Sequence, residues 1–123
     1  MRVLVCEDQD AIRQMITTLV GSSGHEVVGV SNGAMAVEKA STESFDILLL
    51  DLMLPGQLDG FEVCERLRAQ DSMKNLPIFI ISAMDDPDSR ARAKNAGATD
   101  FFGKPFRPLE LLKVIQGIAS SRR

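Results

Sequence analysis

Five short apolar runs constrain the fold of this chain most strongly. They occupy residues 3–6, 27–30, 47–50, 78–81 and 101–102. Unbroken runs of this kind are typical of strands that are buried on both faces of a sheet. Segments with helical spacing separate the runs, and the clearest one places apolar side chains on a single face, namely Ile12, Met15, Ile16, Leu19 and Val20. The alternation predicts an α/β fold, a doubly wound parallel sheet of five strands with helices on both faces.

Four further helices complete the predicted pattern. Apolar periodicity indicates helices around residues 61–67 and 111–118, and weaker patterns indicate helices at 34–40 and 91–96. Asp86 followed by Pro87 is a typical N-cap with a proline in the first turn, so the fourth helix should begin there. Residues 1–123 are expected to form one domain, in which 119–123 are a loose tail or the stub of a linker.

Composition excludes several classes of function. The chain has 14 Lys and Arg against 17 Asp and Glu, and it lacks Tyr and Trp, so direct binding of nucleic acid is not expected. Its apolar runs are too short to span a membrane, and the one at the N-terminus is too short for a secretory signal, which indicates a cytoplasmic protein. Cys6 and Cys64 are expected to be buried, reduced thiols, and His25 to be solvated without a role.

The chemically distinctive residues follow the ends of the predicted strands. Glu7 and Asp8 follow the first strand, and Asp51 follows the third. With a strand order of 2-1-3-4-5, the first and third strands are neighbours and the three carboxylates converge. Carboxylates this close together repel one another unless they take up protons or share a cation, and Mg²⁺ prefers such oxygen ligands.

Two more side chains extend this site toward phosphate chemistry. Ser82 follows the fourth strand and Lys104 comes just after the fifth. A hydroxyl donor and a mobile ammonium are suited to hold phosphoryl oxygens. A carboxylate can also attack phosphorus and form an aspartyl phosphate, and Asp51 is the candidate nucleophile.

Together these segments resemble the receiver domain of response regulators, the phosphoacceptor half of two-component signalling. The resemblance rests on residues 7–8, 48–56, 82–83, 97–98 and 104–106, and it covers nearly the whole chain. It implies a flavodoxin-like, CheY-like fold with strand order 2-1-3-4-5. Two departures stand out, because Glu7 replaces the commoner Asp and the stretch 55–60 is one residue longer than usual.

The resemblance assigns a role to each site residue. Asp51 matches the phosphoacceptor and Asp8 a direct ligand of Mg²⁺, for which Mn²⁺ is an alternative. Glu7 matches a ligand acting through water, and Met53 a ligand through its backbone carbonyl. The phosphate-binding and switch residues of the family are matched by Ser82, Ala83, Lys104 and Phe101. Pro105 matches a cis-proline. Met53 and Met84 match two positions that tune the lifetime of the phosphoryl group.

The resemblance also implies partners. A sensor histidine kinase or a histidine phosphotransfer protein would donate the phosphoryl group to Asp51. A downstream protein or a fused output domain would bind the surface formed by the fourth helix, fifth strand and fifth helix, at about residues 86–120. Such a domain is a signalling switch, not an enzyme, although it assists its own phosphorylation and dephosphorylation.

Three alternatives from other classes remain open at this point. A small aspartate-nucleophile phosphatase uses similar residues, but it generally needs an acid two residues after the nucleophile, where this chain has Met53. A flavin carrier shares the topology, but Glu7 and Asp8 would repel the flavin phosphate. A phosphate-independent interaction module of the same fold is the third alternative.

Overall fold

The computed structural model describes residues 1–121, which form a five-stranded parallel sheet in the order β2-β1-β3-β4-β5. The strands are β1 (Arg2–Cys6), β2 (Glu26–Val30), β3 (Ile47–Leu50), β4 (Ile78–Ser82) and β5 (Asp100–Gly103). The helices are α1 (Asp10–Gly21), α2 (Gly33–Thr42), α3 (Gly60–Arg68), α4 (Pro87–Ala96) and α5 (Pro108–Ser121), with a 3-10 helix η1 (Asp71–Met73). The predicted fold class and strand order are therefore confirmed.

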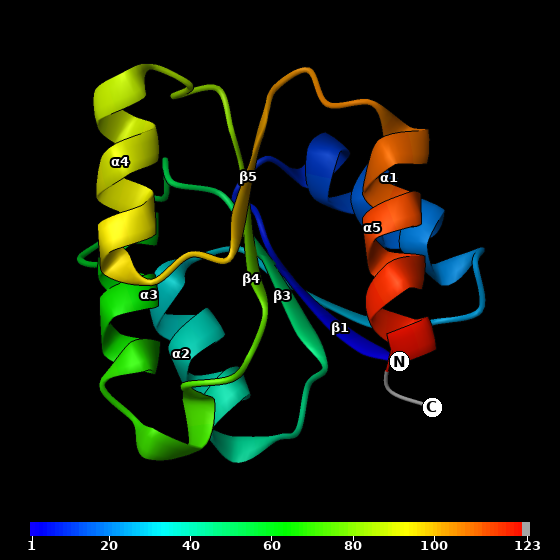
Figure 1. The fold of residues 1–123 in the computed structure, drawn as a ribbon, viewed down its shortest axis with the longest axis horizontal. Helices are drawn as coiled ribbons and strands as arrows, with labels where there is room; N and C mark the ends of the chain where they lie inside the picture. Colours follow the sequence, from blue (N-terminus) through cyan, green and yellow to red (C-terminus); the bar gives the residue numbers. More distant parts are fainter. Residues whose placement is uncertain (122–123) are drawn as a thin grey trace.

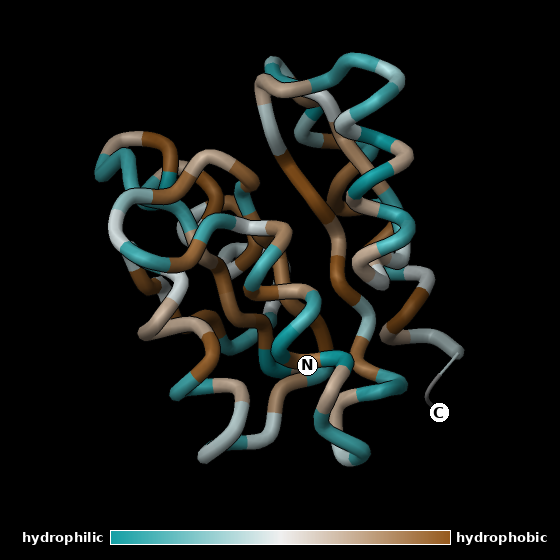
Figure 2. Tube along the Cα trace, turned by 90° about the vertical axis from the view of Figure 1, so that its left-hand side faces the viewer, coloured by the Kyte–Doolittle hydropathy of each residue, from teal (hydrophilic) through white to brown (hydrophobic). Residues whose placement is uncertain are grey.

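The helices form two layers around the sheet. Helices α1 and α5 lie on one side of the strands, and α2, α3 and α4 lie on the other (Figure 1). Because successive strand residues point to opposite faces, each strand feeds two cores. Leu48 and Leu50 pack beneath α2 to α4, whereas Ile47 and Leu49 pack beneath α1 and α5. This double burial explains the unbroken apolar runs, which Figure 2 shows as brown segments in the interior.

Capping residues define where the less apolar helices begin. Asp86 accepts a hydrogen bond from the backbone N–H of Ser89, and Pro87 occupies the first turn, as predicted for α4. Asp59 and Glu62 form a reciprocal capping box at the start of α3. Each cap satisfies N–H groups that have no partner within the helix, so α3 and α4 begin at residues fixed by local sequence.

The structure corrects the predicted tail. Residues 119–121 do not form a loose segment but continue α5, and the Ser121 hydroxyl donates to the carbonyl of Ile118 at 3.0 Å. Helix continuation satisfies backbone groups that a loose tail would leave to water. Residues 122–123, the rest of the predicted tail, lie outside the described part of the chain.

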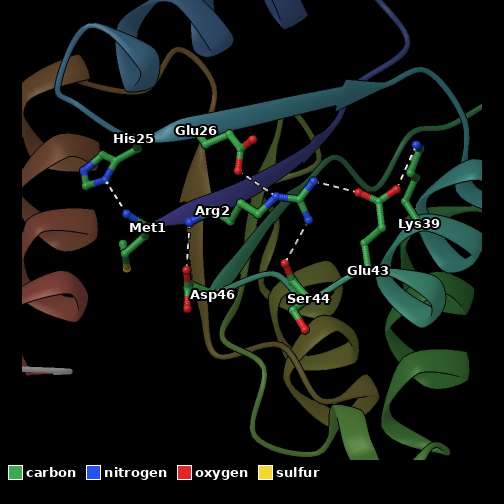
Figure 3. Close-up of polar contacts among 8 residues, drawn as sticks. All are labelled: Met1, Arg2, His25, Glu26, Lys39, Glu43, Ser44 and Asp46. Carbon is green, nitrogen blue, oxygen red and sulfur yellow. Dashed lines mark hydrogen bonds and ion pairs between the residues drawn. The ribbon is translucent and has the colours of Figure 1, made fainter.

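An ionic network at the amino-terminal ends of the strands joins segments that are distant in sequence (Figure 3). The Arg2 guanidinium donates to Glu26 at 2.7 Å, to Glu43 at 2.6 Å and to the carbonyl of Ser44 at 3.1 Å. The backbone N–H of Arg2 donates to Asp46 at 2.7 Å. The network ties β1 to β2 and to the segment between α2 and β3, at the sheet edge opposite the one that carries Asp51.

His25 is less solvated than expected. Its ring is half-buried, and Nδ1 lies 3.2 Å from the N-terminal nitrogen of Met1 (Figure 3). Burial, with a smaller contribution from the neighbouring ammonium, lowers the pKa of His25. Spacing could not reveal this contact because it joins the residues that precede two separate strands, β1 and β2. Within residues 1–121, none of the helices has the length and apolar character needed to cross a membrane.

Candidate functional site

Three carboxylates meet at the carboxyl ends of β1 and β3. These strands are neighbours, and Cys6 pairs with Leu50, so the residues that follow them share one edge of the sheet. One carboxylate oxygen from each of Glu7, Asp8 and Asp51 lies within 4.8 Å of the others. The residues Glu7 and Asp51 are only 2% and 5% exposed. The predicted convergence is confirmed, and three oxygen donors at this separation suit a hard divalent cation such as Mg²⁺.

Lys104 supplies a positive charge to this cluster. Its Nζ lies 2.5 Å from Oε1 of Glu7 and 3.0 Å from Oδ2 of Asp51. Burial alone lowers the pKa of Lys104, but hydrogen bonds to the two carboxylates outweigh it and raise the pKa above its ordinary value. Burial also raises the pKa of Glu7, against the opposing effect of the hydrogen bond from Lys104. The ammonium thus compensates two buried acids at once.

Backbone contacts fix the position of Asp51. Its N–H donates to the carbonyl of Cys6 at 3.1 Å, and its Oδ1 accepts from the N–H of Met53 at 3.1 Å. Gly60 packs against the same segment, because a Cβ there would clash with the Asp51 carbonyl oxygen and lie 2.5 Å from Cα of Leu52. The start of α3 therefore presses directly on the strand end that carries Asp51.

The predicted hydroxyl lies at the end of β4, between β3 and β5. Ser82 is fully buried, and its Oγ accepts a hydrogen bond from the N–H of Met84 at 3.2 Å. Its carbonyl accepts from the N–H of Lys104 at 2.9 Å, which links it to the residue that reaches Asp51. Within residues 1–121, the Ser82 hydroxyl is engaged with the following loop, in which Ala83 is exposed, and not with Asp51.

The other predicted residues border this cluster. The ring of Phe101 is half-buried, and the Arg90 guanidinium lies over it at 4.6 Å from the ring centre. Pro105 is exposed, and the peptide bond that precedes it is cis, as expected. The residue Met53 is 55% exposed.

Two supporting residues escaped sequence reasoning. The Arg13 guanidinium donates a hydrogen bond to the backbone carbonyl of Glu7 at 3.0 Å. No sequence motif predicts this contact. Gly60 follows Asp59 in a pair that is typical of turns, and its missing side chain allows α3 to approach Asp51. The Asp59-Gly60 pair was the one sequence feature that could have drawn attention to Gly60.

An apolar groove of about 430 Å³ adjoins the acidic cluster. Lys104 contributes to both the groove and the cluster. The other lining residues are Ile12, Met15, Pro105, Phe106 and Pro108. The residue Met15 is 48% exposed despite its place on the predicted apolar face of α1, because that face extends beyond the sheet to the rim of this groove.

Known proteins share both the sequence and the fold. The chain is 37% identical over 117 residues to the alkaline phosphatase synthesis transcriptional regulatory protein PhoP of Bacillus subtilis, covering 95% of this chain and 48% of PhoP. The chain thus spans about half the length of this curated relative. The receiver domain of Francisella response regulator 1452 superposes with a TM-score of 0.90 at 29% identity, covering 99% of this chain and 98% of that domain.

A further solved structure bears on the acidic cluster. The receiver domain of a sensor histidine kinase from Pseudomonas aeruginosa PAO1 superposes with a TM-score of 0.88 at 31% identity, covering 96% of this chain and 97% of that one. That receiver domain has a magnesium ion coordinated in its active-site cleft. Receiver domains therefore bind Mg²⁺ in an acidic pocket of the kind found here.

The model of the response regulator receiver domain matches residues 3–116. This match spans the sheet and most of α5, so the phosphatase, flavin-carrier and phosphate-independent alternatives are not needed to explain the cluster. The chain belongs to the response regulator receiver domain family, the phosphoacceptor signalling domains of two-component systems.

Proposed function

We propose that Asp51 accepts the phosphoryl group that switches this domain. The proposal rests mainly on the contact between Lys104 Nζ and Asp51 Oδ2 at 3.0 Å, at the edge where the three carboxylates meet. A carboxylate held by backbone contacts can attack phosphorus, and a nearby ammonium can receive the phosphoryl oxygens. The Asp51 carboxylate accepts hydrogen bonds from the backbone N–H of Met53 and from Lys104. Glu7 has similar contacts, and Asp51 is preferred because it is the residue that matches the phosphoacceptor of the family.

The acidic cluster would hold Mg²⁺, with Mn²⁺ as an alternative. Glu7, Asp8 and Asp51 would contribute carboxylate oxygens, and Met53 its backbone carbonyl. The donor set fits, because all of these groups are hard oxygen ligands. When bound, the ion would neutralise charge on the phosphoryl oxygens. Lys104 would shift from the carboxylates toward the phosphoryl group, and Ser82 with the N–H of Ala83 would complete its binding site.

The phosphoryl donor would be the phosphohistidine of a sensor histidine kinase or of a histidine phosphotransfer protein. An Asp51 carboxylate oxygen forms the new bond to phosphorus while the nitrogen–phosphorus bond breaks. The electron pair of that bond returns to the imidazole, which takes a proton from solvent. Because such kinases draw on ATP, the proposal places the domain in the cytoplasm.

The apolar groove beside Lys104 would receive the donor protein. Ile12, Met15 and Phe106 offer apolar contacts, and Lys104 makes the groove continuous with the phosphorylation site. A helix that carries histidine between apolar residues would fit such a surface, because its apolar side could pack in the groove while the histidine faces Asp51.

Phosphorylation would change the output surface at residues 86–120. The added charge of about −1.5 to −2 would draw Ser82 and Lys104 toward the phosphoryl group. Phe101 would then turn inward from its half-buried position beneath Arg90. A downstream protein or a fused output domain would read this change. Because the net charge is −3, the proposal includes no direct binding of nucleic acid by this domain and no contact with a membrane.

The domain would also govern how long the phosphoryl group persists. Met53 and Met84 border the strand ends that carry Asp51 and Ser82. Neither side chain can hydrogen-bond strongly to an attacking water. We therefore expect slow self-catalysed dephosphorylation.

Intact mass after incubation with acetyl phosphate tests the proposed phosphoacceptor. Wild type should gain one phosphoryl group in Mg²⁺ and none in EDTA, and Asp51→Asn should gain none in either condition. Asp71→Asn changes an exposed acid in η1 and should be labelled like wild type. A wild-type protein that stays unlabelled would favour a phosphate-independent module, and turnover of a small phosphoester would favour a phosphatase.

A further inference from the structure

The backbone carbonyl of Glu7 lies just beyond the end of β1, where the sheet no longer supplies its partner. The Glu7 N–H still donates to the carbonyl of Val30 at 3.1 Å. Its carbonyl instead accepts from Nη1 of Arg13 at 3.0 Å. A carbonyl in a partly buried site needs such a partner, and a side chain from the second turn of α1 provides it here.

Two further contacts hold the side chain of Arg13 in place. Its aliphatic stem crosses β2 at Gly29, where a Cβ would lie 3.3 Å from both Cγ and Cδ of Arg13. Its Nη2 donates to Oδ1 of Asp10 at 2.6 Å. The side chain is 24% exposed. Because the guanidinium is planar and its donors have fixed directions, these contacts also fix the direction of the bond to Glu7.

This bond controls the peptide that joins two of the three acidic residues. The Glu7 carbonyl and the Asp8 nitrogen belong to one planar unit, so fixing one orients the other. The Glu7 carboxylate is held as well, since it accepts from the N–H of Gln9 at 3.2 Å. The ion pair with Asp10 offsets the positive charge of Arg13, which would otherwise oppose a cation nearby.

We propose that Arg13 is a positioning residue for the acidic cluster. It holds the Glu7–Asp8 peptide in the orientation that directs both carboxylates toward Asp51 before a divalent cation binds. Preorganised ligands lose less conformational freedom on binding and therefore bind more tightly. The inference rests on the proposed function, in which this cluster is the magnesium site.

Calorimetric titration of the full chain with MgCl₂ tests this role. Arg13→Met keeps an aliphatic stem over Gly29 and removes both hydrogen bonds. We expect the Kd for Mg²⁺ to rise about tenfold, as is typical when a residue that orients metal ligands is lost. Arg13→Gln, a second variant that can still offer one donor to the Glu7 carbonyl, should raise the Kd less. Asp10→Asn removes only one of the contacts that orient Arg13 and keeps the bond to Glu7, so it should raise the Kd less than Arg13→Met does.

A readout without metal separates positioning from a general loss of stability. Hydrogen exchange and ¹⁵N relaxation at the Asp8 and Gln9 amides should show greater mobility in metal-free Arg13→Met than in wild type. The amides of β4 should be unchanged. An unaltered Kd in both Arg13 variants, or unaltered mobility at Asp8 and Gln9, would overturn the proposal. A wild-type protein that binds no Mg²⁺ would instead refute the proposed metal site.

Discussion

The ammonium nitrogen of Lys104 lies 3.0 Å from Oδ2 of Asp51, across 53 positions of sequence. The same nitrogen contacts Glu7, so one ammonium group serves two buried carboxylates. A divalent cation would take over part of this task. Lys104 would then be free to bind a phosphoryl group while it remains beside its acceptor.

Removing Lys104 should destabilise the metal-free protein. Lys104→Met leaves Glu7 and Asp51 without their cation, and we expect the free energy of unfolding to fall by about 2 kcal/mol in EDTA. Saturating Mg²⁺ should recover most of this loss, because the ion neutralises the same carboxylates. Urea unfolding followed by circular dichroism measures both values.

Lys74→Met is the matched control for this experiment. Lys74 forms an exposed ion pair with Asp71, so its loss should change stability by less than about 0.5 kcal/mol, with or without Mg²⁺. Equal losses in the two variants would contradict the role assigned to Lys104.

Gly60→Ala should disturb the strand end that carries Asp51. The added methyl group would meet backbone atoms of Asp51 and Leu52, which cannot turn aside as a side chain can. We expect a loss of about 2 kcal/mol in the free energy of unfolding and slower labelling by acetyl phosphate. Gly117→Ala is the opposite case, because open space surrounds that helical glycine. This substitution should raise the free energy of unfolding by about 0.5 to 1 kcal/mol. The same sign for both changes would contradict the packing argument.

Substitutions at the two methionines should shorten the lifetime of the phosphoryl group. Met53→Asn or Met84→Glu introduces a group that can orient an attacking water. We expect dephosphorylation to accelerate about tenfold, which corresponds to about 1.4 kcal/mol of barrier. Intact mass, followed over time after removal of the donor, gives the rate. Met35→Asn changes an exposed methionine of α2 and serves as the control. The hypothesis fails if both substitutions leave the decay unaltered.

If the groove binds the donor protein, a substitution there should slow phosphoryl transfer from a kinase but not from acetyl phosphate. Met15→Lys places a charge on the apolar rim of the groove. It should slow phosphoryl transfer from a histidine kinase by about tenfold or more. The kinase for this test is one that phosphorylates the wild-type domain. Labelling by acetyl phosphate should be unchanged, since that donor is too small to need the groove. Met35→Lys provides the same chemical change on α2, outside the groove. Equal transfer rates for wild type and Met15→Lys would show that the donor docks elsewhere.

Both thiols should resist alkylation while the protein is folded. Burial raises the pKa of Cys6 and of Cys64 to about 12, and Cys6 also donates to the carbonyl of Asn32 at 3.4 Å. At pH 8 the thiolate fraction is then roughly 10⁻⁴, and iodoacetamide reacts with thiolate. Mass spectrometry should find no alkylation of the folded protein and two modified cysteines in urea. Rapid modification of either thiol in the folded protein would contradict their burial.

Sequence alone determined the order of the strands and main helices and the edge of the sheet at which the chemistry lies. The run at residues 47–50 predicts a strand because four successive apolar residues require burial on both faces, which is a local property. Asp86 and Pro87 locate the start of α4 for the same reason, since a cap acts within one turn. Glu7, Asp8 and Asp51 could be predicted to converge because parallel strands end at a common edge.

Only the tertiary structure decided how that edge is held together. Lys104 reaches Glu7 across 97 positions, and local patterns carry no information about that distance. The same holds for the support of Glu7 by Arg13 and for the approach of Gly60 to Asp51, both of which depend on how a helix packs against a strand. Residue type and spacing define which groups are available, but side-chain contacts between elements depend on packing, which forms only when the whole domain folds.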